Sequence, residues 1–382
     1  MFEKILHRSQ CAKLLADFKV VERLNLSIPI LIGIFIFFNP SPYMSSIKEI
    51  CFYTSFFGIL FLFLSKKANL SFRAPLSLPF VLFALWVFLG IFFALDKQNT
   101  LHDFYSHLLR YIVLYYILIN FFGSRKRLVV LCWTIIISSA IFSFGCVFYF
   151  YFVLENSLSI RLGLGNVGIE ATNLIGIITL PAIIFSLNII LTEKHLYCRI
   201  GSLICLVPLF AATILTQARS AFMATAFGIN IYLIRKNKKM WLAFNSLLII
   251  VFLITPIHNR FFSNISSNER LNFFYLTVEI IKDYPIIGIG FGGETYKNAI
   301  DLEAYNEKLP TKYRSAIIFN DPHSMLPSIA VRTGMVGLAL FFYILFVFSK
   351  MCWTCIKHGK DDFPCFAKAR TGYQHKPRQF DR

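Results

Sequence analysis

Apolar residues are arranged along the chain in long runs that short polar connections separate. Ten apolar segments stand out, at residues 24–38, 50–64, 76–95, 105–122, 128–153, 170–191, 198–216, 220–234, 240–256 and 323–349. A helix needs about 20 mostly apolar residues to cross about 30 Å of hydrocarbon. The pattern therefore predicts an all-α, polytopic transmembrane helix bundle of about ten spans.

Two polar regions interrupt this pattern. One is the connection 257–322, which is far longer than any other, and the second is the tail 351–382. We expect a transmembrane bundle of about nine spans at 1–256, a polar loop at 257–322 and a last transmembrane helix at 323–350. The tail carries no apolar run and is expected to be disordered or non-native.

The composition agrees with a membrane protein. Hydrophobic residues make up 57% of the chain and charged residues 15%, against about 45–50% and about 25% in soluble domains. Too few polar residues remain to cover a soluble surface. The composition therefore favours an integral membrane protein over a soluble enzyme of one or two domains.

The distribution of positive charge predicts the orientation. A net charge of +18 in a soluble chain would indicate a nucleic-acid partner. With the N-terminus inside, 25 of the 38 Lys and Arg residues fall on the inner side, and each of four short outer connections holds only one. Basic residues collect on the cytoplasmic side of membrane proteins. We expect both termini in the cytoplasm, the loop 257–322 outside, membrane lipids as surroundings and no nucleic acid.

The long loop contains a predicted amphipathic helix at 267–283, which Asp283-Tyr284-Pro285 ends. Its apolar positions are Leu271, Phe274, Tyr275, Val278 and Ile281. Ser266 and Glu269 have the spacing of a capping box. Arg270 is then in the first turn, where the helix dipole disfavours a cation unless an anion binds there. A solvated helix charge is the alternative.

Two further residues are candidates for chemistry at the outer boundary. Arg219, with Gln217 nearby, lies between two apolar segments, and a guanidinium grips phosphate through two parallel hydrogen bonds. The alternative is a cation that reaches the membrane boundary. His323 follows Asp321-Pro322 at the mouth of the last span. Its imidazole suits a general base, while a structural histidine is the competing interpretation.

The glycines after the predicted loop helix fit a turn better than a nucleotide site. Gly288, Gly290 and Gly293 match G-x-G-x-x-G, but this fingerprint needs a preceding strand within a βαβ unit. We expect these glycines to let the loop turn tightly. No histidine pair has the spacing of metal ligands, so neither a metal nor another cofactor is predicted.

Together these motifs resemble the O-antigen ligase family of bacterial inner-membrane proteins, which is related to O-antigen polymerases and protein O-oligosaccharyltransferases. The resemblance covers roughly residues 160–345. The motifs are Thr216-Gln217-Ala218-Arg219-Ser220, Glu269-Arg270, the run from Asp283 to Gly290, Pro322-His323-Ser324, and Gly334 with Gly337. Their order, their spacing and their shared outer location are more specific than any one of them.

The resemblance implies an inverting, metal-independent glycan transfer in lipopolysaccharide biosynthesis. The donor would be an undecaprenyl diphosphate-linked O-antigen, and the acceptor a sugar hydroxyl of the lipid A core, on the periplasmic side of the inner membrane. Arg219 and Arg270 would hold the diphosphate, and His323 would activate the hydroxyl. Supporting residues would be Gln217, Asp321, Ser324 and Arg332.

Departures from the family pattern leave more than one hypothesis open. Ser324 and Arg332 stand where the family commonly has Asn and Glu, and members usually continue for two more spans. A truncated or frame-shifted C-terminus is therefore expected, which would leave an inactive remnant. Two further hypotheses are a polysaccharide polymerase of the same superfamily and a membrane transporter or flippase.

Overall fold

The computed structural model describes residues 2–66, 70–163, 172–236, 238–254, 265–314 and 324–358. Every regular element in these ranges is helical, which confirms the all-α class, and the described part of each of the ten apolar segments lies largely in a helix. Among the described residues, six helices are long and apolar enough to cross a membrane. They are Val20–Phe38, Ser45–Leu64, Arg125–Val153, Leu174–Thr192, Leu196–Leu215 and Met325–Cys355. The count of about ten spans stays a prediction.

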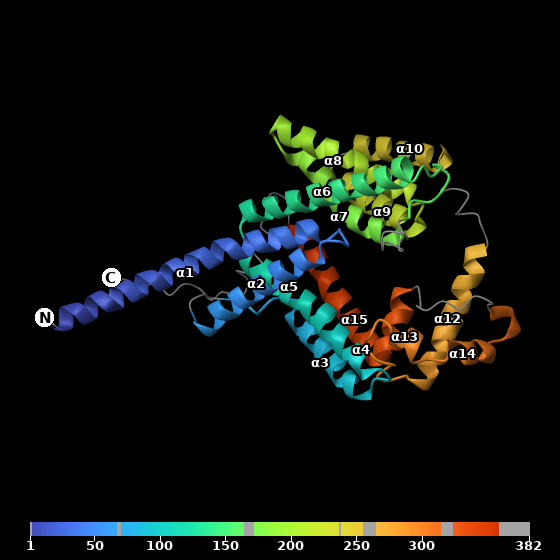
Figure 1. The fold of residues 1–382 in the computed structure, drawn as a ribbon. Coiled ribbons are helices and arrows are strands. Elements are labelled where there is room, and N and C mark those ends of the chain that lie inside the picture. Colours follow the sequence, from blue (N-terminus) through green and yellow to red (C-terminus); the bar gives the residue numbers. More distant parts are fainter. Residues whose placement is uncertain are drawn as a thin grey trace. The chain divides into compact units, whose positions relative to one another are not determined.

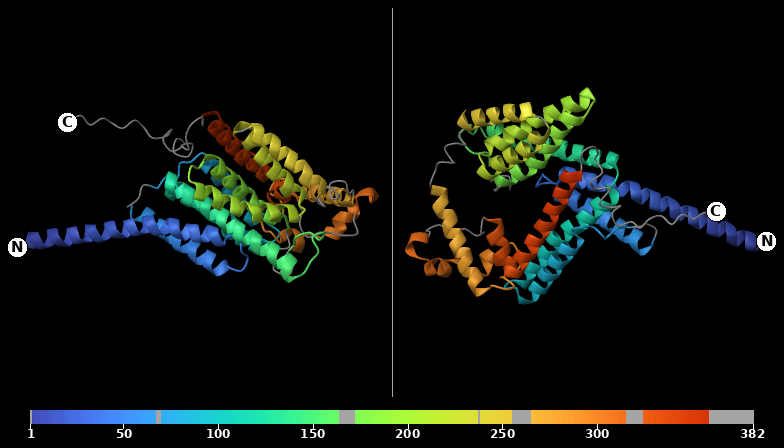
Figure 2. Two further views of the ribbon diagram at one scale, coloured as in Figure 1. Left: turned by 90° about the horizontal axis from the view of Figure 1, so that it is seen from above. Right: turned by 180° about the vertical axis from the view of Figure 1, so that it is seen from behind.

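The helices separate into two compact units, residues 1–69 with 124–263 and residues 70–123 with 264–382. The elements of the first unit are α1 (Phe2–Phe38), α2 (Ser45–Leu64), α6 (Arg125–Phe148), η2 (Tyr149–Val153), α7 (Thr172–Thr192), α8 (Leu196–Leu215), α9 (Arg219–Lys236) and α10 (Lys238–Ile254). Within it, α6, α7 and α8 lie side by side (Figures 1 and 2).

Small and hydroxyl-bearing residues let the helices of the first unit approach closely. Thr179 on α7 and Thr213 on α8 share a hydrogen bond of 2.9 Å, and the Ser202 hydroxyl donates to the Ser186 carbonyl at 3.0 Å. Gly176 on α7 faces Ala221 on α9 so closely that a Cβ at Gly176 would overlap the alanine methyl group. Such small residues are typical of helix contacts in membranes.

The elements of the second unit are α3 (Ser77–Phe93), α4 (Lys97–Asp103), η1 (Phe104–Leu109), α5 (Arg110–Phe121), α12 (Ile265–Asp283), α13 (Thr295–Asn298), α14 (Leu302–Lys308), η4 (Thr311–Tyr313) and α15 (Met325–His358). Helices α3 and α15 lie side by side (Figure 1). Phe83 and Val87 of α3 pack against Leu340 and Phe341 of α15. Residues of α12 and the following short helices form a separate core around Leu276 and Tyr296.

The predicted loop helix is present as α12, with its end at Asp283 as expected. It begins at Ile265, however, so Ser266 lies inside the helix instead of capping it. For the same reason Arg270 is in the second turn, not in the first turn where it was predicted. The first-turn argument for an anion at Arg270 is therefore wrong.

The face of α12 that is buried also differs from the expected one. Leu276 and Ile280 are fully buried, whereas Leu271 and Phe274 of the predicted apolar face are 46% and 50% exposed. Asn272, also buried, donates from its side chain to the Asn306 side chain at 3.0 Å and to the Tyr313 carbonyl. Tyr275 and Ile281 of the predicted apolar face are partly buried against the same core as Leu276. The predicted face is therefore covered in part, and Leu271 and Phe274 are the positions that stay exposed.

Candidate functional site

Helix α15 is interrupted at Gly334, whose φ and ψ are 70° and −179°. The residues after α12 pair with the backbone at this break. The Ile289 and Gly290 amides donate to the carbonyls of Val331 at 2.9 Å and Arg332 at 3.2 Å. A backbone group without a partner costs several kcal/mol in hydrocarbon. These hydrogen bonds therefore satisfy backbone groups that the interruption at Gly334 would otherwise leave without partners in an apolar helix.

Glycine permits the close approach at this break. A Cβ at Gly288 would lie 2.6 Å from the Val331 carbonyl oxygen, and a Cβ at Gly334 would overlap the Ile286 carbonyl. Gly288 and Gly290 also have φ values of +78° and +119°, which L side chains rarely adopt. The tight turn expected for these glycines is confirmed.

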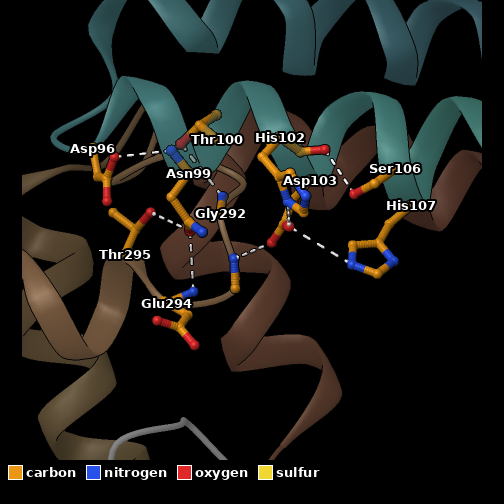
Figure 3. Close-up of polar contacts among 11 residues, drawn as sticks. Asp96, Asn99, Thr100, His102, Asp103, Ser106, His107, Gly292, Glu294 and Thr295 are labelled. Atoms are coloured by element: carbon orange, nitrogen blue, oxygen red, sulfur yellow. Dashed lines mark hydrogen bonds and ion pairs between the residues drawn. The ribbon is translucent and has the colours of Figure 1, made fainter. Parts of the chain in front are cut away.

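The next residues of the loop rest on α4, which begins after Asp96 (Figure 3). The Asp96 side chain accepts from the Asn99 amide at 2.9 Å and so caps α4. The Asn99 side-chain oxygen accepts from the Glu294 amide at 3.1 Å, and Thr100 accepts from the Gly292 amide at 3.4 Å. The N-terminal part of α4 thus holds the loop through its backbone.

Gly293 is held from two sides. Its amide donates to Asp103 Oδ2 at 2.5 Å, and its carbonyl accepts from Arg332 Nη2 at 3.2 Å. The Asp103 side chain is only 13% exposed. Arg332, which was predicted to support the site, thus fixes the position of the glycine loop.

Two histidines share the Asp103 carboxylate. His102 Nδ1 lies 3.0 Å and His107 Nε2 lies 3.6 Å from Asp103 Oδ1 (Figure 3). His107 belongs to the π-helical segment η1, a geometry that is frequent at functional sites. Sequence reasoning did not select Asp103. The spacing of Asp103 and His107 at i and i+4, with His102 adjacent, was the available signal.

Arg219 belongs to the first unit, where it is the first residue of α9. The turn from α8 to α9 contains Gln217 in a left-handed conformation, with φ 48°. The Gln217 side chain is buried and donates to the Ser159 carbonyl at 3.2 Å. Arg161 Nε donates to the Thr216 carbonyl at 2.7 Å. Gln217 therefore fixes the turn that places a half-buried Arg219 at a helix N-terminus.

Of the remaining predicted site residues, the structure describes the side chain of one, Ser324. Ser324 is exposed, and its carbonyl accepts from the Ser328 amide at 2.9 Å in the first turn of α15. Arg270 lies on α12, but its side chain is outside the described part. Asp321 and His323 also lie outside the described residues. Their predicted roles therefore stay predictions.

The apolar helices and the loop packed into a broken span define the class as a multi-pass helical membrane protein. Residues 203–342 match the family model described as O-antigen ligase. This confirms the resemblance for that part of the chain, which carries Arg219, Arg270 and His323. The description of this family model indicates an enzyme of the ligase type. No curated protein matches the chain.

Proposed function

We propose that this protein transfers a glycan from undecaprenyl diphosphate to a sugar hydroxyl of the lipid A core. The reaction belongs to lipopolysaccharide biosynthesis and takes place on the periplasmic face of the bacterial inner membrane. The observation that carries the proposal is the O-antigen ligase match over residues 203–342, which spans all three main candidate residues. The cytoplasmic bias of Lys and Arg supports the orientation.

The proposed chemistry is one direct displacement at the anomeric carbon. The acceptor oxygen forms a bond to this carbon while the bond to the diphosphate oxygen breaks. Undecaprenyl diphosphate leaves with the bonding electron pair, and the acceptor proton passes to His323. A single displacement inverts the anomeric configuration. The leaving group gains negative charge, so fixed cations that contact it stabilise the transition state.

Arg219 has the position that suits a diphosphate. It begins α9, and a helix N-terminus attracts anions through its amide groups and dipole. Its guanidinium adds a charge that can bind two phosphate oxygens at once. Arg270 supplies the second cation in this proposal. Two arginines then neutralise the leaving group without a divalent cation.

The supporting residues act on backbone geometry. Gln217 fixes the turn before Arg219 through the Ser159 carbonyl. Arg332 fixes the loop through the Gly293 carbonyl. We assign both a positioning role, whereas Ser324 and Asp321 flank His323 and support it locally.

Substitution of the three main residues tests the proposal. We expect R219A, R270A and H323A each to lower the rate of transfer at least about 100-fold, the scale of a lost general base or charge-stabilising donor. R219K keeps the charge but loses the two-point contact, so it should recover only part of the rate. R199A, at an exposed arginine of α8, is the matched control. Full activity in all three alanine variants would contradict the mechanism.

The identity of the product tests the acceptor. Purified protein is incubated with the lipid-linked glycan and lipid A-core, with and without a chelator. Glycan attached to lipid A-core supports ligation, and lengthened glycan on the carrier assigns the chain to the polymerases. Activity that the chelator abolishes would overturn the metal-independent mechanism. Passage of the intact donor across vesicle membranes without transfer would instead indicate a flippase.

A further inference from the structure

Two exposed histidine rings lie beside the Asp103 carboxylate, and neither has a role in the proposed displacement. The side chains of His102 and His107 are 57% and 60% exposed. The Tyr105 side chain lies between them in sequence and is half exposed. Its ring meets the edge of the His102 ring at a centroid distance of 5.4 Å. We call His102, Tyr105 and His107 the ring cluster.

The carboxylate determines which nitrogen atoms of the cluster remain for a ligand. An ionised carboxylate only accepts hydrogen bonds, so a His102 ring that donates from Nδ1 to Asp103 leaves its Nε2 for another partner. His107 Nε2 lies 3.6 Å from the same carboxylate oxygen, which is beyond hydrogen-bond distance. His102 Nε2 and the ring nitrogen atoms of His107 therefore remain for a ligand, on rings that are more than half exposed. Imidazole nitrogen atoms can pair with the hydroxyl groups of a sugar.

The aromatic ring supplies the complementary apolar contact. Tyrosine offers a large, rigid surface with a polar tip at a low cost in conformational entropy. A sugar ring presents hydroxyl groups at its rim and C–H groups on its faces. An exposed Tyr105 ring beside the imidazole of His102 thus matches both parts of a sugar.

The cluster is held in place before any ligand arrives. Asp103 is fixed by the Gly293 amide at 2.5 Å, and Gly293 is fixed in turn by Arg332 at 3.2 Å. The Ser106 hydroxyl donates to the His102 carbonyl at 2.7 Å (Figure 3). A site that is ordered in advance loses less entropy on binding.

We propose that the ring cluster, oriented by Asp103, binds hydroxyl groups of a sugar in the glycan substrate. The site rests on the proposed function, which supplies the glycan. The sugar belongs either to the donor glycan or to the acceptor, and the chemistry of recognition is the same for both. Asp103 acts as a positioning residue in this site.

Binding is tested first, without any transfer reaction. The full chain in lipid nanodiscs, with ¹⁵N-labelled histidine, is titrated with methyl glycosides of glucose, galactose and N-acetylglucosamine. We expect the imidazole signals of His102 and His107 to shift with at least one glycoside. The double variant H102A/H107A should weaken binding at least 10-fold. D103N keeps an acceptor for the Gly293 amide but loses the charge, and should weaken binding about threefold or more. H195A, at an exposed histidine before α8, is the control.

Kinetics then identify the source of the sugar. In H102A/H107A we expect kcat within threefold of the wild type and a KM at least 10-fold higher for one substrate. A higher KM for the lipid A-core places the acceptor at the cluster, and a higher KM for the lipid-linked glycan places the donor there. R219A, by contrast, should lower kcat.

The two proposals fail in different ways. A wild-type chain that transfers no glycan but binds a glycoside through the ring cluster would contradict the proposed function and support this site. Normal transfer with unchanged KM values in H102A/H107A, together with glycoside binding equal to the wild type, would overturn the site. Equal melting temperatures of the variants ensure that a loss of binding is not a loss of folding.

Discussion

At the scale of single residues, the site depends on backbone contacts that only glycine allows. Gly288 and Gly334 both have positive φ and both face backbone atoms of the other segment. Their role is therefore steric and conformational, and it needs no ligand. Arg332 adds a side-chain contact to the same assembly through Gly293.

We expect G334A to destabilise the protein by more than about 2 kcal/mol, because alanine resists a positive φ and its Cβ would overlap the Ile286 carbonyl. Thermal unfolding in detergent measures this change. G33A in α1 is the control, since no atom lies within 4 Å of its added Cβ. That variant should be unchanged or more stable by up to about 1 kcal/mol. Equal melting temperatures for G334A and G33A would contradict this view of the break.

A second prediction concerns Asp283 at the end of α12. The Tyr305 hydroxyl donates to Asp283 Oδ2 at 2.6 Å and, with the charge of Lys308, lowers the pKa of the Asp283 carboxyl. A lowered pKa in the folded state adds stability above the ordinary value of about 3.9. This stability is lost as the pH falls through the folded pKa. The melting temperature of D283N should therefore lie below that of the wild type at neutral pH, and the difference should shrink below about pH 4.

The variant Y305F distinguishes the effect of the Tyr305 hydrogen bond from the effect of the Asp283 charge. It removes the main cause of the lowered pKa and keeps the carboxylate. Its melting temperature should approach that of the wild type in the same acidic range. A difference that grows on acidification in either variant would have the wrong sign for this explanation.

At the scale of elements, α12 has two apolar faces with different surroundings. One face, with Leu276 and Ile280, fills the core that also contains Tyr296. The other face, with Leu271 and Phe274, is about half exposed. A helix with an uncovered apolar stripe suits the boundary between lipid and water. A substitution should therefore lower the stability more on the buried face than on the exposed face.

We expect L276A to cost about 2–5 kcal/mol, because it leaves a cavity in a closed core. L271A, five residues earlier on the same helix, should change stability by no more than about 0.5 kcal/mol. Chemical unfolding of both variants in detergent gives the comparison. A larger loss of stability in L271A than in L276A would show that the face predicted from the sequence is the buried one.

The sequence predicted what depends on local pattern. The described part of each of the ten apolar segments is largely helical, and α12 ends at Asp283 before Pro285, because long apolar runs and proline act over a few residues. The buried face of α12 could not be predicted, since leucine and phenylalanine on both faces fit either side. The Asp103 site was also missed, because its partner Gly293 is 190 residues away along the chain. The motif containing Arg219 was predictable, but the fixing of its turn by Gln217 was not.

At the scale of the whole molecule, the number of membrane spans determines on which side each connection lies. In the part of the chain that the structure describes, six helices satisfy the length and hydropathy of a span, and α3 is a shorter apolar helix of 17 residues. A topology with ten spans and a topology with only these six place the start of α4 on opposite sides of the membrane. If α3 crosses, residues near Lys97 are outside, and if it does not, they are inside.

Fusions of alkaline phosphatase decide between these topologies, because the enzyme is active only outside the cytoplasm. We expect activity for a fusion after residue 96, as ten spans require. A fusion after residue 40 should be active and one after residue 66 inactive with either count, so they serve as controls. An inactive fusion after residue 96 would remove α3 from the spans and with it the predicted outer location of α4.

The break in α15 also has a consequence for biogenesis. Residues 285–290 are synthesised before α15, and they supply the partners that the backbone of Val331, Arg332 and Met335 uses at the break. A nascent α15 that enters the lipid without them would carry unsatisfied peptide groups. We therefore expect membrane insertion of α15 to be coupled to docking of the preceding segment. A chain whose glycine segment is kept from docking should leave this last helix stalled at the insertion machinery.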